Sequence, residues 1–158
     1  MMIRTLSLEK LPEVRPILIR FLKKHGDGRI THKAIRWLKQ IQATEVKPGT
    51  LILLAFHQQK LVGLMAFSHY GIEHAITAVH PNWRKQGIGM AMLKKALSQL
   101  KKVYTRVAYD NIPSLKLCFS CGLVAFDMIK GPTGKPTLLL GGGEWKHEDI
   151  QKDSHGFL

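Results

Sequence analysis

The sequence predicts a single α/β domain in which helices flank a mixed, mostly antiparallel sheet. The chain has 158 residues, 45% of them hydrophobic, and this length and composition are typical of one globular domain. Hydrophobic residues spaced three or four apart, typical of helices, alternate with the extended apolar runs of strands. Glycine and proline clusters separate these segments. We expect residues 1–141 to form the domain and residues 142–158 a polar C-terminal tail.

The first part of the chain is expected to hold a strand and two helices. Residues 2–7 predict a short strand, and apolar side chains recurring from Leu11 to Lys24 predict an amphipathic helix. A cluster of turn-forming residues, His25–Gly28, ends that helix. A second helix is predicted from Thr31, a suitable N-cap, to about Ala43.

Three strands follow, two of them as a hairpin. The extended runs 50–57 and 60–69 are joined by Gln58-Gln59, and the two-residue connection indicates a hairpin. Residues 73–80 predict the third strand, which Pro81 ends.

The last part is expected to hold two further helices and three strands. Helix 87–100 leads into strand 103–109, and Asp110 or Asn111 can cap the next helix, which carries Pro113 in its first turn and ends at Gly122. The closing strands are predicted at residues 123–129 and 136–140. The run Gly141–Gly143 is expected to open a tail of low order.

The segment between residues 79 and 89 has the pattern of a phosphate-binding loop. A strand ends at Val79, and a helix opens near Gly87. Unpaired N–H groups and the helix dipole favour an anion at such a helix start. Glycines at 87 and 89 remove Cβ atoms that would keep a diphosphate away, and Arg84 and Lys85 add positive charge. An ordinary turn before a surface helix is the alternative interpretation.

Two motifs in order then resemble the GNAT superfamily of N-acetyltransferases. The first is Arg84-x-x-Gly87-x-Gly89 after a strand. The second is Val107-x-x-x-Asn111-x-x-Ser114, followed by Gly122-Leu123 where the family has Gly-Phe. The order of strands and helices is similar to the family's over about residues 1–140. The resemblance implies that the strand ending at Val79 and strand 103–109 splay apart and hold the cofactor between them.

The resemblance implies that acetyl-CoA is the acetyl donor. The chain would move the acetyl group to a primary amine by direct attack in a ternary complex. The family's diphosphate rests on loop amides, and its pantetheine arm pairs with the preceding strand. Asn111 and Ser114 could instead act only as helix-capping residues. By position, the contacts with the cofactor fall on Ala78, Val79, Arg84, Lys85, Gln86, Gly87, Ile88, Gly89, Met90, Asn111 and Ser114.

Glu73 is the candidate general base, because the attacking amine must lose a proton. A Glu occupies this place at the start of the strand in the histone-acetylating branch of the family. Glu73 is also the only acidic residue between Glu45 and Asp110. His74 and His80 are alternatives because imidazole titrates near neutrality. Other members of the family use no essential base, and Glu73 could also be a solvated carboxylate at a strand end.

Cys118 occupies the position of a frequent family tyrosine that protonates the leaving thiolate. A thiol is a weak hydrogen-bond donor, so the usual acid is in doubt, and Tyr109 at the nearby strand end is an alternative. Cys118 and Cys121 form a C-x-x-C without a second cysteine pair or a suitably spaced histidine. We therefore expect structural cysteines and no metal site.

The formal net charge of +13 is concentrated in two blocks, at residues 1–48 and 81–116, each carrying +7. The second block surrounds the proposed cofactor loop. The first falls on the helices that the family uses to frame the acceptor, so we expect an acceptor that is neutral or acidic apart from its amine. The acceptor's identity cannot be derived from the sequence, and Trp37 is either core or a wall of its site.

Two other functions remain open. A non-catalytic GNAT domain that binds acyl-CoA as a sensor fits the missing tyrosine. A basic nucleic-acid-binding protein fits the charge but lacks a recognised motif. The longest apolar runs are far short of the ~20 residues of a membrane helix, and no signal peptide opens the chain. We therefore expect a cytoplasmic protein that does not associate with membranes. No residue of the sequence decides the oligomeric state, so a homodimer stays open.

Overall fold

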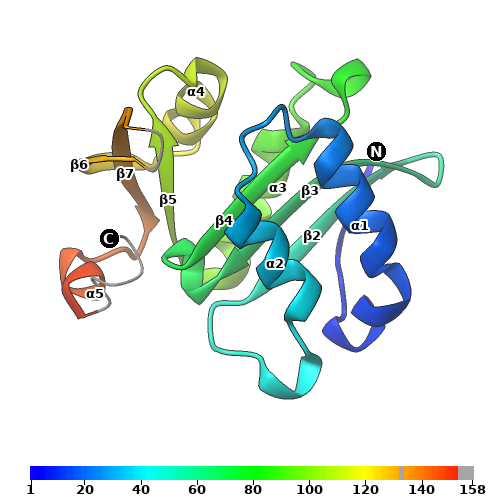
Figure 1. Cartoon of the computed structure of the whole chain (residues 1–158). Coiled ribbons are helices and arrows are strands. Elements are labelled where there is room, and N and C mark those ends of the chain that lie inside the picture. The colour runs from blue at the N-terminus through cyan, green and yellow to red at the C-terminus, as the bar shows by residue number, and fades with distance from the viewer. Residues whose placement is uncertain (132–133, 153–158) are drawn as a thin grey trace.

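The computed structural model describes residues 1–131 and 134–152. The expected order of strands and helices holds up to β7, and a helix that was not predicted follows at residues 147–152 (Figure 1). The strands are β1 (Met2–Thr5), β2 (Leu51–His57), β3 (Lys60–Ser68), β4 (His74–Val79), β5 (Lys102–Ala108), β6 (Val124–Lys130) and β7 (Pro136–Gly143). The helices are α1 (Leu11–His25), α2 (His32–Gln40), α3 (Ile88–Leu100), α4 (Ile112–Ser120) and α5 (His147–Lys152).

The strands form two antiparallel sheets. The first has the order β1-β2-β3-β4 and the second the order β5-β7-β6. The Gln58-Gln59 turn joins β2 to β3 as predicted, with φ angles of 48° and 69°. Both residues are left-handed, as in the type I′ turns that match the twist of a hairpin. The boundary between the sheets lies between β4 and β5, which form no ladder with each other, so these two strands are the splayed pair.

Helices cover both faces of the first sheet. In Figure 1, α1 and α2 lie in front of the sheet and α3 lies behind it. Successive side chains of a strand point to opposite faces. Leu53 of β2 therefore packs with Met92 of α3, whereas Ile52 packs with Leu18 and Leu38 of α1 and α2. Burial on both faces explains the uninterrupted apolar run of β2.

Two local predictions require correction. Thr31 caps α2 as predicted, accepting a bond from the Ala34 amide at 3.1 Å, but the helix ends at Gln40 and not near Ala43. The glycine run 141–143 does not open a tail of low order. It completes β7, where Gly142 pairs with Val103.

Glycine is required in this run because neighbouring side chains pack against the strand. A Cβ on Gly142 would lie 2.7 Å from the Leu123 side chain, and one on Gly141 would lie 2.7 Å from the Trp145 ring. Helix α5 then packs beside β5, where Lys102 pairs with Asp149 at 3.0 Å. Residues 153–158 of the expected tail lie outside the described residues, and the domain boundary at residue 141 stays a prediction. Among the described helices, none has the length and hydropathy needed to cross a membrane.

Candidate active site between strands β4 and β5

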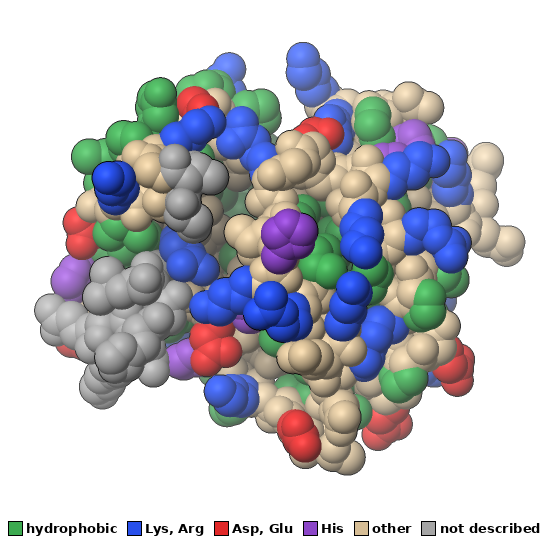
Figure 2. Space-filling view, in the orientation of Figure 1, with side chains coloured by type: hydrophobic (Ala, Val, Ile, Leu, Met, Phe, Trp, Pro, Cys, Tyr) green, Lys and Arg blue, Asp and Glu red, His purple; other side chains and the backbone are tan. Residues whose placement is uncertain are grey.

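Strands β4 and β5 touch at one end and separate toward the other. At the contact, Gly71 lies so close to β5 that an added Cβ would meet the Tyr104 carbonyl oxygen at 1.8 Å. Arg106 of β5 donates to the Glu73 carbonyl at 3.3 Å. Toward the carboxyl ends of the strands, the N-termini of α3 and α4 follow. Figure 2 shows the surface hollowed at the top of this view, with Lys and Arg side chains beside the hollow.

The ladder between β3 and β4 decides which backbone groups face this gap. The His80 amide donates to the Val62 carbonyl at 2.8 Å, and the register is regular along β4. Antiparallel pairs alternate between hydrogen-bonded and non-bonded, so Ala78 directs its amide and carbonyl into β3. The outward groups belong to Thr77 and Val79. Of the two strand residues predicted to pair with the cofactor arm, Val79 thus directs its backbone groups away from β3 and Ala78 does not.

The loop before α3 presents unpaired amides at the open end of the gap. Gly87 has φ = 82° and precedes the helix, and the Ala91 amide makes the first intrahelical bond, to the Gly87 carbonyl at 3.0 Å. The amides of Ile88, Gly89 and Met90 come before that bond, so helix geometry leaves them without a partner in α3. Their arrangement and the helix dipole suit an anion.

The two loop positions, 87 and 89, are glycine for different structural reasons. A Cβ on Gly87 would meet nothing within 4 Å, so its left-handed φ and the open space beside it explain the residue. A Cβ on Gly89 would lie 3.1 Å from the Leu117 side chain. Gly89 therefore also makes room for α4, and the expectation that both glycines make room for a diphosphate stays a prediction.

The side chains of the loop are used unequally. Arg84 pairs with Asp27 at 2.7 Å and donates to the Val79 and His25 carbonyls at 3.0 and 3.1 Å. This side chain ties the loop to the turn after α1 rather than standing free. Gln86 donates to the Asn82 carbonyl at 3.1 Å. Lys85 is exposed, with φ = 62°.

Two histidines lie beside the same loop. The rings of His25 and His80 are 4.5 Å apart, and His80 accepts a bond from the Asn82 amide at 3.1 Å. Desolvation and then the neighbouring His80 lower the pKa of His25. Desolvation and then Lys60 lower the pKa of His80. Both rings are therefore neutral at pH 7.

Helix α4 borders the gap and buries Cys118. Asn111 stands at the N-cap without a side-chain capping bond, so the predicted cap is present in position only. Cys118 is 5% exposed, and burial followed by the neighbouring Cys121 raises the pKa of its thiol to about 11, with a hydrogen bond to Ser114 acting the other way. The Ser114 hydroxyl is thus directed along the helix to Cys118.

Glu73 lies at the contact end of the gap with several partners. Ser68 donates to its carboxylate at 3.1 Å, and Lys47 and His69 lie 3.5 and 3.9 Å away. Burial acts to raise its pKa, but the Ser68 bond and the charges of Lys47 and His69 outweigh burial, so the pKa of Glu73 lies below its ordinary value. The carboxylate is therefore ionised at neutral pH. Sequence reasoning did not identify Ser68, Lys47 or His69, because no local pattern of the sequence brings them to Glu73.

A cavity of about 220 Å³ opens beside this carboxylate. Trp37 forms one wall and stacks on His74, with ring centroids 5.1 Å apart. Burial lowers the pKa of His74 to about 4, with Lys33 acting in the same direction, so its imidazole is neutral. The lining residues are Trp37, Gln40, Ile41, Gln42, Glu45, Lys47, Thr50, Ser68 and Glu73.

Metal chemistry has no evident location in the described part of the chain. Among residues 1–131 and 134–152, no three His, Cys, Asp or Glu side chains gather closely enough to hold a metal ion. Cys118 and Cys121 are both free thiols.

Residues 12–123 match the model of the Acetyltransferase (GNAT) family. A ribosomal-protein-alanine N-acetyltransferase from Brucella melitensis shares the fold at 17% identity and TM-score 0.60, covering 90% of this chain and 99% of its own. An aminoglycoside 6′-N-acetyltransferase complexed with coenzyme A matches at 14% identity and TM-score 0.65, covering 93% of this chain and 99% of its own. The structure of yncA from Salmonella typhimurium with acetyl-CoA matches at 14% identity and TM-score 0.61, covering 92% of this chain and 95% of its own. A search of curated proteins found no match.

Proposed function

Since the chain belongs to the GNAT family of acetyltransferases, we propose that it transfers an acetyl group from acetyl-CoA to a primary amine in a ternary complex. One observation carries the proposal. Strand β4 has at its carboxyl end a loop whose amides have no partner in α3, and at its amino end an ionised carboxylate beside a cavity. Glu73 and Val79 are six residues apart, which is about 20 Å along a strand. A long, phosphate-bearing donor suits this separation.

The gap fits acetyl-CoA in two respects. The space beside Gly87 is open, and the amides of Ile88, Gly89 and Met90 can hold a diphosphate there. Thr77 directs its amide and carbonyl outward and Val79 its amide, and these groups can pair with an amide-bearing arm, while the Val79 carbonyl accepts from Arg84. When bound, acetyl-CoA supplies an acyl group that is activated as a thioester.

Side chains near the loop have separate parts in holding the cofactor. Lys85 is free to add charge beside the diphosphate. Arg84, which binds Asp27 and two backbone carbonyls, acts as a positioning residue for the loop. Asn111 and Ser114 can contact the cofactor only from the opposite side of the gap, at the start of α4.

Glu73 would accept the proton that the amine loses, directly or through one water. Because the pKa of its carboxyl is lowered, Glu73 is ionised at neutral pH but is a weak base. It is therefore suited to an amine that is already partly neutral, such as an α-amino group of pKa about 7.7–8.0 rather than a lysine of about 10.4. His74, with a pKa of about 4, is also a weak base at neutral pH.

Cys118 is not suited to protonate the leaving thiolate. Its thiol is buried, and at a pKa of about 11 it is a weaker acid than an ordinary thiol of pKa about 8.5. A thiolate of ordinary pKa can leave without a strong acid, so we propose that solvent protonates it. Tyr109, which is 53% exposed, is the other available group.

The test is release of free thiol from acetyl-CoA with a panel of amines. We expect amine-dependent release in the wild-type protein and a large loss of kcat in Glu73→Gln. Glu9→Gln removes an exposed carboxylate outside the site and is the control. Full activity in Glu73→Gln would eliminate this residue as the base. A thermal shift with acetyl-CoA but no release across the panel would favour the sensor function instead.

A further inference from the structure

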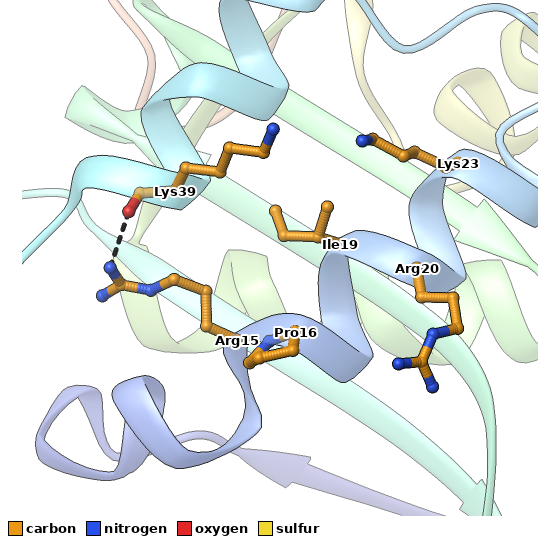
Figure 3. A pocket seen from close by; sticks show the side chains of 6 residues that line it. All are labelled: Arg15, Pro16, Ile19, Arg20, Lys23 and Lys39. Carbon is orange, nitrogen blue, oxygen red and sulfur yellow. Dashed lines mark hydrogen bonds between the residues drawn. The ribbon is translucent and has the colours of Figure 1, made fainter.

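A second cavity lies on the outer side of α1 and α2, apart from the β4–β5 gap. It has a volume of about 470 Å³. Figure 3 shows Lys23 of α1 and Lys39 of α2 extending toward one another over Ile19. The lining residues, which we call the basic groove, are Arg15, Pro16, Ile19, Arg20, Lys23 and Lys39.

The charge of the basic groove is not neutralised within the described structure. Its lining holds four cationic side chains and no carboxylate. In residues 1–131 and 134–152, no carboxylate pairs with Arg20, Lys23 or Lys39, all of which are exposed. Lys and Arg side chains gather over α1 and α2 in Figure 2 as well. Like charges held together around an apolar floor favour a bound anion.

Arg15 differs from the other three cations because its position is fixed. Its guanidinium donates to the Lys39 and Ile41 carbonyls at 2.6 and 2.5 Å, so it caps the end of α2. Ile41 in turn lines the cavity beside Glu73. The carboxyl-terminal end of α2 therefore separates the basic groove from the Glu73 cavity, and one ligand can reach both only by crossing this end.

The length of that crossing limits the ligand. A helix with its side chains is about 10–12 Å across, and an extended chain advances about 3.3–3.6 Å per residue. Three to four residues of an extended peptide thus cover the distance. A compact small amine cannot place its amine beside Glu73 and an anionic group in the basic groove.

We propose that the basic groove binds acidic side chains of a peptide acceptor, at about the fourth and fifth residues counted from the N-terminal residue whose amine is acetylated. The proposal rests on the proposed function and names its substrate class. The lowered pKa of Glu73 agrees with an α-amino group, and the four cations agree with Asp or Glu at the distant positions. Charge at these positions would set the affinity of the acceptor and not the chemical step.

The test uses two fluorescent peptides that differ only in residues four and five, which are Glu in one and Gln in the other. Binding is measured by anisotropy without acetyl-CoA, and acetylation by thiol release. The variant Lys23→Glu/Lys39→Glu reverses two exposed charges of the groove. The control Lys10→Glu/Lys130→Glu makes the same change in charge at exposed residues that line neither cavity.

We expect the groove variant to weaken binding of the acidic peptide about tenfold or more, and to raise its KM without changing kcat. The control variant should change the affinity for the acidic peptide less than twofold. The groove variant should likewise change the affinity for the Gln peptide and the KM for acetyl-CoA less than twofold. Equal loss with both peptides, or equal loss in both variants, would overturn the proposal. So would a rise in the KM for acetyl-CoA, which would assign the groove to the donor, or displacement of the acidic peptide by RNA at equal charge.

Failure of the two proposals can be told apart. Groove-dependent peptide binding with no acetylation of any amine would refute the proposed activity and leave the assignment of the groove intact. Acetylation of both peptides with equal KM would refute the assignment of the groove and leave the proposed activity intact.

Discussion

Substituting Gly87 with Ala tests the loop at the open end of the gap. Gly87 has φ = 82°, and an added Cβ would meet nothing within 4 Å. The substitution therefore introduces backbone strain without a clash. Holding an ordinary residue in the left-handed region costs about 1–2 kcal/mol. If the loop must keep this conformation to hold the diphosphate, the affinity for acetyl-CoA should fall about 5–30-fold, because 1.4 kcal/mol is a factor of ten.

Gly122→Ala is the matched control. Gly122 has φ = 86° and equally open surroundings, but it lies at the far end of α4. Gly122→Ala should lower the free energy of unfolding in urea titrations by the full cost of the strain, whereas Gly87→Ala should lower it less without acetyl-CoA, because a loop that relaxes when empty takes up the strain on binding. Only Gly87→Ala should lose affinity in calorimetric titrations with acetyl-CoA, with kcat at saturation nearly unchanged. Equal affinities in the two variants would refute the assignment of the loop.

Three further predictions concern side chains around the gap. The Arg84–Asp27 pair is partly exposed and is worth about 0–1 kcal/mol, so Asp27→Asn should raise the KM for acetyl-CoA less than about fivefold. Arg84→Ala also loses two hydrogen bonds to backbone carbonyls and should raise the KM for acetyl-CoA more than Asp27→Asn does. A larger rise in Asp27→Asn than in Arg84→Ala would contradict the positioning role. Cys118→Ala should keep kcat and lower the melting temperature, and a collapse of kcat would restore Cys118 as the acid. Glu73→Gln should lower the free energy of unfolding at pH 7. Because the folded pKa of Glu73 is depressed, this difference should shrink as the pH falls below the ordinary value of 4.5, and a difference that does not shrink there would contradict the ion pairs.

Local patterns were enough to predict much of the fold. Thr31 is read as an N-cap because its hydroxyl acts on an amide only three residues away. The Gln58-Gln59 turn is read from two adjacent extended runs. The glycine run 141–143 was misread because glycine near a chain end is typical of loops. Its reason is the packing of Leu123 and Trp145 against the strand, which no local pattern reveals.

The sequence predicts the parts of the candidate site that lie in one continuous segment, but not the contacts between separate elements. The loop around Gly87 is a continuous segment, so its motif indicates both its structure and its function. The partners of Arg84 and Glu73 come from other elements, such as Asp27 and Lys47. Which amides of β4 face the gap depends on the register with β3. These features arise only when the tertiary structure forms.

A structure of the protein with acetyl-CoA tests the central claim most directly. The account predicts a diphosphate within hydrogen-bond distance of the amides of Ile88, Gly89 and Met90. It also predicts an arm paired with the outward groups of Thr77 and Val79, and an acetyl group at the Glu73 end of β4. A donor bound outside the β4–β5 gap, or one whose acetyl group lies away from Glu73, would contradict it.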